Sequence, residues 1–135
     1  MALSFILIEN LEIDLYIAHK LIKITMGDDA PIETFMSAET GLDHIVSAKL
    51  KKGDRAIILL DLMMPRLNGA DFISLFETLP ETVTSHYQIV IVTSSMNKTE
   101  LDRLGKKKYV ETVIEKPLTQ EKFKAVLEQM QIETN

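Results

Sequence analysis

The chain has 135 residues and a mass of 15.3 kDa, the size of one compact domain. Its composition, 46% hydrophobic and 26% charged with five Gly and four Pro, excludes collagen-like and disordered chains. A net charge of −5 disfavours a surface built to bind nucleic acid or anionic lipid, and the absence of Cys excludes disulfides and thiolate metal sites. No secretory signal or membrane-length apolar run is present, so we expect a cytoplasmic protein.

Five short apolar runs, rich in Ile and Val, have the length of strands and are too short for typical helices. They are Leu3–Ile8, Ile32–Met36, Ala56–Leu60, Ile89–Val92 and Val110–Ile114. The second run is the weakest, because it alternates apolar and polar side chains.

Between these runs the apolar side chains repeat with helical spacing. The first two helices have their stripes at Ile17, Ala18, Leu21 and Ile22, and at Leu42, Ile45 and Val46. A third is expected over Asp71–Leu79, before Pro80, and a fourth begins after Asn97, which has Glu100 three residues later. The last has Thr119 as N-cap and an inward stripe of Phe123, Val126, Leu127 and Met130.

Strands that alternate with helices favour parallel pairing through right-handed crossovers. The sequence therefore predicts a doubly wound α/β fold with a five-stranded parallel sheet, formed by residues 1–135 as a single domain with no output domain. Ligands of such folds bind outside the carboxyl ends of the strands, at the switch point of the topology.

Polar residues follow four of the predicted strands at this edge. They are Glu9 and Asn10, then Asp61, then Thr93 and Ser94, and finally Lys116. Pro65 and Gly69 favour a turn that holds Asp61 at the mouth of the sheet. Pro117 biases the preceding residue to extended geometry, which would direct the Lys116 ammonium toward Asp61; a cis bond before Pro117 would do the same.

Four segments in this order resemble the receiver domain of two-component response regulators. They are Ile6–Asn10, Leu59–Pro65 with Asn68 and Gly69, Val92–Ser94, and Glu115–Leu118. The resemblance extends over nearly the whole chain and implies the flavodoxin-like, CheY-like three-layer sandwich. It also implies that Asp61 accepts a phosphoryl group from a sensor histidine kinase or phosphotransfer protein, with Mg²⁺ as cofactor.

The resemblance assigns a role to each site residue. The phosphoryl group would be bound by Met63, Thr93, Ser94 and Lys116, and Mg²⁺ by Glu9, Asn10, Asp61 and the carbonyl of Met63. Thr93 and Val113 would be the switch positions. We expect no conventional enzyme activity beyond Mg²⁺-dependent self-phosphorylation and self-dephosphorylation at Asp61.

Two residues depart from the family pattern. Asn10 stands where the family has an acidic metal ligand, so we expect weak Mg²⁺ binding and slow phosphorylation unless Glu9 compensates. Val113 stands where the family usually has Tyr or Phe, so the coupling to Thr93 would be blunted, and Tyr109 is expected to pack rather than to replace that ring.

The favoured interpretation is a stand-alone response regulator that signals to a downstream protein through a changed surface, without direct contact to nucleic acid or membrane. The alternative is a pseudo-receiver that binds proteins without phosphate. Neither a dinucleotide-binding nor a nucleotide-binding glycine motif is present, which argues against those enzymes. Ser95 and Asn97 are interpreted as loop polarity, and Lys106–Lys108 as a helix end rather than a docking patch.

Overall fold

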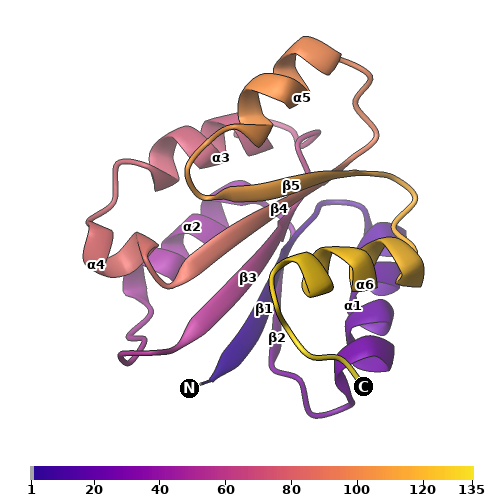
Figure 1. The fold of residues 1–135 in the computed structure, drawn as a ribbon. Helices are drawn as coiled ribbons and strands as arrows, with labels where there is room; N and C mark the ends of the chain where they lie inside the picture. Colours follow the sequence, from indigo (N-terminus) through magenta and orange to yellow (C-terminus); the bar gives the residue numbers. More distant parts are fainter. Residues whose placement is uncertain (1) are drawn as a thin grey trace.

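A computed structural model describes residues 2–135, and each predicted apolar run forms a strand (Figure 1). The strands are β1 (Leu3–Ile8), β2 (Ile32–Phe35), β3 (Arg55–Leu60), β4 (Tyr87–Thr93) and β5 (Val110–Glu115). Strand β1 has the predicted bounds, and β2 ends one residue before the predicted Met36. The other three strands are longer than predicted by one to three residues, because neighbouring residues continue the backbone pairing.

Six helices connect and follow the strands. They are α1 (Glu12–Met26), α2 (Ala38–Ser47), α3 (Gly69–Phe76), α4 (Glu81–Thr84), α5 (Lys98–Gly105) and α6 (Gln120–Gln129). The two predicted N-caps are confirmed, because the Thr119 hydroxyl accepts from the Lys122 N–H at 3.2 Å and the Asn97 amide oxygen accepts from the Glu100 N–H at 3.1 Å.

The segment between β3 and β4 differs from the prediction. Helix α3 begins at Gly69, two residues before the predicted Asp71, because Asn68 is the N-cap and forms a reciprocal capping box with Asp71. It ends at Phe76, and the single-turn helix α4 follows Pro80. A four-residue helix has no apolar repeat, which is why helical periodicity could not predict α4.

All strand pairs are parallel, in the order β2-β1-β3-β4-β5, which confirms the predicted doubly wound sheet. The chain moves from β1 to β2 on one side and then returns to place β3 on the other side of β1. The switch point therefore lies between the carboxyl ends of β1 and β3, where ligands of such folds bind.

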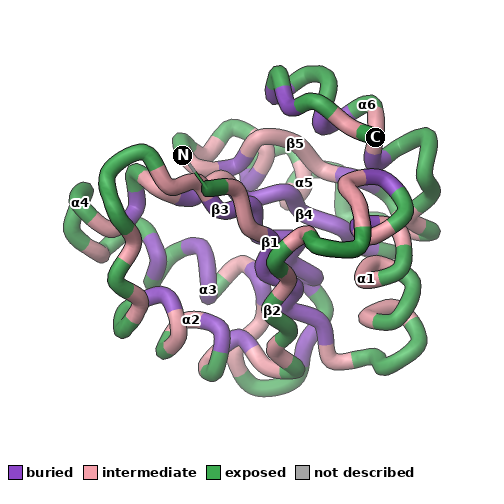
Figure 2. Tube along the Cα trace, turned by 90° about the horizontal axis from the view of Figure 1, so that it is seen from below, coloured by how far each residue is buried: buried purple, intermediate pink, exposed green. Residues whose placement is uncertain are grey.

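Alternate residues of the central strands face two separate apolar layers. Helices lie on both sides of the sheet, which makes the molecule a three-layer sandwich with buried strands in the middle (Figure 2). Ile6 and Ile58 face a layer formed with α2, α3 and α5, whereas Leu7 and Leu59 face a layer formed with α1 and α6. Both faces are covered, so these strands read as continuous apolar runs.

Two members of the predicted helical stripes are exposed instead of buried. Ile17 on α1 and Val46 on α2 are exposed, while Ile22 and Ile45 on the same helices are fully buried. None of the helices within residues 2–135 is both long and apolar enough to cross a bilayer.

Candidate functional site

Two carboxylates lie side by side at the switch point. Ile8 pairs with Leu60, so the next residues, Glu9 and Asp61, leave the sheet together, and the Asp61 N–H donates to the Ile8 carbonyl at 3.0 Å. Both are buried, with Glu9 at 7% and Asp61 at 4% exposure. Burying charged groups is costly without a compensating partner, so this pair indicates a site for a cation.

The loop after β3 fixes the Asp61 side chain. The Met63 N–H donates to Asp61 Oδ1 at 3.2 Å, and the Gly69 N–H donates to the Leu62 carbonyl at 3.1 Å. A Cβ on Gly69 would lie 2.7 Å from the Asp61 carbonyl oxygen, so only glycine allows α3 to begin this close to Asp61. The Met63 side chain itself is exposed.

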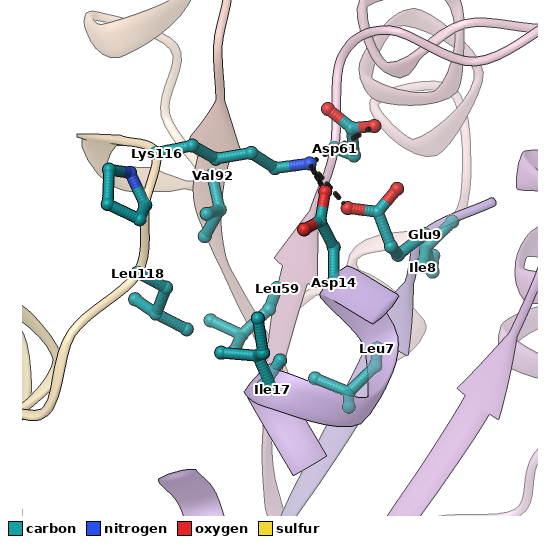
Figure 3. A pocket seen from close by; sticks show the side chains of 12 residues that line it. Leu7, Ile8, Glu9, Asp14, Ile17, Leu59, Asp61, Val92, Lys116 and Leu118 are labelled. Atoms are coloured by element: carbon teal, nitrogen blue, oxygen red, sulfur yellow. Dashed lines mark hydrogen bonds and ion pairs between the residues drawn. The ribbon is translucent and has the colours of Figure 1, made fainter. Parts of the chain in front are cut away.

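Lys116 supplies the cation. It follows β5, precedes Pro117 through a cis peptide bond, and extends its side chain across the strand ends (Figure 3). Its Nζ donates to Glu9 Oε1 at 2.6 Å and to Asp14 Oδ2 at 2.8 Å, and it lies 3.7 Å from Asp61 Oδ2. The predicted approach of Lys116 to Asp61 is confirmed, although its two shortest contacts are with other carboxylates.

This cluster of Glu9, Asp14, Asp61 and Lys116, here called the ammonium cluster, is dominated by negative charge. Burial raises the pKa of Glu9, and the neighbouring Asp61 raises it further. The hydrogen bond from Lys116 lowers the pKa, but the net result is a raised pKa. Burial lowers the pKa of Lys116, but hydrogen bonds to Asp14 and Glu9, with the charge of Asp61, outweigh it and the net pKa is raised. One ammonium faces three carboxylates, which favours the approach of a further cation.

Asp14 is the member of the cluster that the sequence analysis missed. It lies in the first turn of α1, four residues before Ala18, which packs against the core. Residues four apart share a helix face, so the inward position of Ala18 was a signal that Asp14 would face the carboxyl edge of the sheet. Apolar side chains form the rest of this pocket, below the cluster: Leu7, Ile17, Leu59, Val92 and Leu118 (Figure 3).

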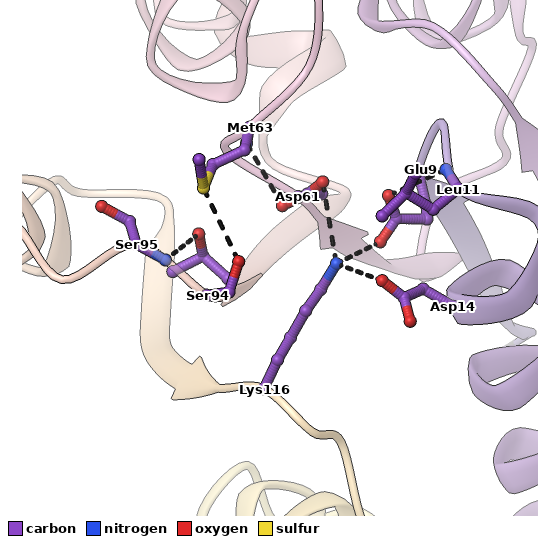
Figure 4. Close-up of polar contacts among 9 residues, drawn as sticks. Glu9, Leu11, Asp14, Asp61, Met63, Ser94, Ser95 and Lys116 are labelled. Atoms are coloured by element: carbon purple, nitrogen blue, oxygen red, sulfur yellow. Dashed lines mark hydrogen bonds and ion pairs between the residues drawn. The ribbon is translucent and has the colours of Figure 1, made fainter.

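Thr93 is the last residue of β4, and Ser94, which follows it (Figure 4), extends the site toward the loop before α5. Thr93 is fully buried, and its hydroxyl accepts from the Ser95 N–H at 3.1 Å. Ser94 Oγ lies 3.6 Å from the Met63 sulfur, which joins the loops after β3 and β4. The Lys116 N–H donates to the Thr93 carbonyl at 2.9 Å, so the backbones of these two residues are directly connected.

The oxygen donors near Asp61 fit a hard divalent cation. Asn10, the residue after Glu9, has a buried Oδ1 without a hydrogen-bond partner in residues 2–135, and an orphaned amide oxygen is a ligand of the type that Mg²⁺ takes. Within the same residues, no group of three or more His, Cys, Asp or Glu is arranged to hold a metal. Any ion here therefore depends on amide and carbonyl oxygens in addition to carboxylates.

Val113 on β5 and Tyr109, which precedes β5, pack against the apolar layer formed with α2, α3 and α5. Val113 is half-buried and packs against the layer that contains Phe76, with an open groove beside it. Tyr109 also packs, as predicted, because its ring meets Phe76 edge to face at 5.3 Å and its hydroxyl accepts from Thr84. Lys107 in the basic run pairs with Glu77 at 3.5 Å.

Solved structures with this architecture include a response regulator receiver protein from Dyadobacter fermentans, with TM-score 0.82 and 24% identity over 98% of this chain and 100% of that chain. A two-component response regulator from Cytophaga hutchinsonii has a TM-score of 0.76 and 19% sequence identity, over 96% of this chain and 97% of that chain. A response regulator receiver domain from Rhodospirillum rubrum has a TM-score of 0.70 and 25% sequence identity, over 94% of this chain and 89% of that chain.

This chain has the response regulator receiver fold. No protein-family model matches the sequence, and no curated protein matches it. The receiver fold is thus evident from the arrangement of strands and helices, at 19–25% identity to these solved structures. In receiver-fold terms, the ammonium cluster lies at the switch point of the sheet, where the two central strands end.

Proposed function

We propose that this receiver domain accepts a phosphoryl group on Asp61 from a phosphohistidine of a sensor kinase or phosphotransfer protein. The observation that carries the proposal is a buried carboxylate, Asp61, with an ammonium 3.7 Å away at the switch point of a receiver fold. Phosphoryl transfer requires an in-line nucleophile and positive charge near the phosphoryl oxygens.

In the proposed step an Asp61 carboxylate oxygen bonds to phosphorus as the phosphorus–nitrogen bond of the donor breaks. The electron pair of that bond returns to the imidazole nitrogen, so the donor leaves as histidine and Asp61 becomes an acyl phosphate. Lys116 would neutralise charge on the phosphoryl oxygens, and the Thr93 hydroxyl would leave Ser95 to bind one of them.

Mg²⁺ would be held by Asp61, Glu9, Asn10 Oδ1 and the carbonyl of Met63. When bound, it would reduce the repulsion between the Asp61 carboxylate and an incoming phosphoryl anion. Lys116 cannot do this alone, because Glu9 and Asp14 already take its two shortest hydrogen bonds.

We propose that phosphorylation changes a protein-binding surface over α5 and β5. The Thr93 backbone leads into the loop before α5, and a groove there is lined by Met96, Leu101 and Val113. Met96 is 78% exposed, so an apolar side chain is available to a downstream protein.

The proposal is tested by intact mass measurement after incubation with acetyl phosphate and Mg²⁺. We expect a base-labile gain of one phosphoryl group in the wild-type chain and in Asp102→Ala, a matched change at an exposed carboxylate of α5. Asp61→Ala should show no gain. Absence of the gain in the wild-type chain, or its persistence in Asp61→Ala, would favour the alternative of a phosphate-independent protein-binding module.

A further inference from the structure

The hydrogen bonds of the Lys116 ammonium point away from Asp61. Its two hydrogen bonds to carboxylates go to Glu9 at the end of β1 and to Asp14 on α1, at 2.6 and 2.8 Å. The 3.7 Å separation from Asp61 Oδ2 exceeds hydrogen-bond length. Figure 4 shows the ammonium between the three carboxylates, with Asp14 on the α1 side.

The contact between Asp14 and Lys116 is partly shielded from water. The side chain of Lys116 is 15% exposed and that of Asp14 is 29% exposed, and the pair joins residues 102 positions apart in the chain. Shielded ion pairs with short hydrogen bonds are held more firmly than exposed pairs. Asp14 therefore restrains the direction in which the ammonium points.

An ammonium has three N–H donors, and Glu9 and Asp14 take two of them, so the phosphoryl group can receive more than one hydrogen bond from Lys116 only if one of these carboxylates gives up its own. We propose that Asp14 is a positioning residue that competes with the phosphoryl group on Asp61 for the Lys116 ammonium. This inference rests on the proposed function, because it requires a phosphoryl group at Asp61. Asp14 thereby weakens the phosphorylated state relative to a chain that lacks this carboxylate.

The contact itself can be tested without phosphorylation, from the side-chain ammonium signals of ¹⁵N-labelled protein. We expect a protected Lys116 signal in the wild-type chain, and several-fold faster hydrogen exchange or loss of the signal in Asp14→Asn. Glu12→Gln removes the other acidic group from the first turn of α1 and should leave the signal unchanged. An unchanged signal in Asp14→Asn would overturn the proposal.

The competition is tested by the affinity for beryllofluoride, an analogue of the phosphoryl group, at saturating Mg²⁺. We expect Asp14→Asn to bind about three- to tenfold more tightly than the wild-type chain, and Glu12→Gln to change by less than about twofold. Equal tightening in both variants would show an unspecific charge effect, and no tightening in Asp14→Asn would show no competition; either result overturns the inference.

The two proposals fail in different ways. If the wild-type chain binds beryllofluoride but Asp14→Asn does not bind it more tightly, the inference fails and the proposed function stands. If the wild-type chain does not bind beryllofluoride, the proposed function and the competition both fail, and the ammonium signal still reports whether Asp14 holds Lys116.

Discussion

Asp61 lies beside a second buried carboxylate, Glu9, and neither is fully neutralised by Lys116. Asp61→Asn removes one charge from this pair while Lys116 keeps Glu9 and Asp14. We therefore expect the variant to have a free energy of unfolding about 1 kcal/mol higher than the wild-type chain at about pH 7 without metal. Urea unfolding measures this difference.

The extra stability of Asp61→Asn should decrease as the pH is lowered. The pKa of Glu9 is raised by folding, so between its ordinary value and the raised value the folded chain binds more protons than the unfolded chain, and stability falls as pH rises. Asp61→Asn removes one cause of the rise, so its advantage should shrink toward about pH 4, where Glu9 is protonated. Asp102→Asn is the control, and an advantage that grows on acidification would contradict the argument.

A second prediction at this scale concerns the metal. Asn10→Asp adds a carboxylate beside Glu9 and Asp61, and we expect it to raise Mg²⁺ affinity about tenfold or more over a weak wild-type site. NMR titration is the suitable measurement because the chain has no Trp. Asn97→Asp makes the same change at a helix cap and should have no effect. Sub-millimolar binding by the wild-type chain would contradict the prediction.

Individual residues were predicted from the sequence where backbone position alone determines them. Asp61 and Lys116 were predicted because each follows a clear apolar strand, and parallel strands end at one edge. The division of hydrogen bonds around Lys116 was not predictable, because it depends on how far the side chain reaches across the sheet. Asp14 was missed because it belongs to a helix, whereas the sequence analysis considered only residues at strand ends.

At the scale of elements, the start of α3 determines where the loop after Asp61 can lie. Gly69→Ala would place a methyl group 2.7 Å from the Asp61 carbonyl oxygen and from Leu62 Cα, both backbone atoms. We expect a loss of stability of about 2 kcal/mol and slower phosphorylation by acetyl phosphate, because the loop must move.

The control is Gly105→Ala at the end of α5. Its Cβ would lie 3.7 Å from Val113 Cγ2, an ordinary contact, so stability should be unchanged or slightly higher. Denaturation midpoints and phosphorylation rates are measured for Gly69→Ala and Gly105→Ala and compared with those of the wild-type chain. Equal effects at Gly69 and Gly105 would show that the close approach of α3 to Asp61 is not required.

Elements with a strong local signal were predicted well. The strands have continuous apolar runs because both faces of the sheet are covered, and α6 has both a cap and a regular stripe. Helix α4 has neither, and the start of α3 depended on the choice between Asn68 and Asp71 as cap. The start of α3 is determined by side-chain hydrogen bonds, which the spacing of apolar residues does not predict.

At the scale of the whole molecule, one face of α1 has exposed apolar side chains beside the pocket. Ile13, Tyr16 and Ile24 are each more than half exposed, and by their spacing they share one helix face with Ile17 and with the exposed Lys20. Since Ile17 lines the pocket that contains Asp61, a partner that brings phosphohistidine to Asp61 can cover this face.

We expect Ile13→Ser and Tyr16→Ala to slow phosphoryl transfer from a phosphorylated histidine kinase that serves the wild-type chain by about tenfold or more. Both variants should react normally with acetyl phosphate, which needs no docking surface. Val46→Ser makes a matched change on α2, at a residue that is 57% exposed, and should transfer normally. Equal slowing with both donors would indicate damage to Asp61 instead of lost docking.

The hydrogen bond from the Lys116 amide to the Thr93 carbonyl gives the molecule an internal reporter. Because this bond joins the ends of β4 and β5, amide hydrogen–deuterium exchange at residue 116 records how often the two strand ends separate. A signal transmitted through these main chains does not require an aromatic ring on β5, and Val113 is compatible with it.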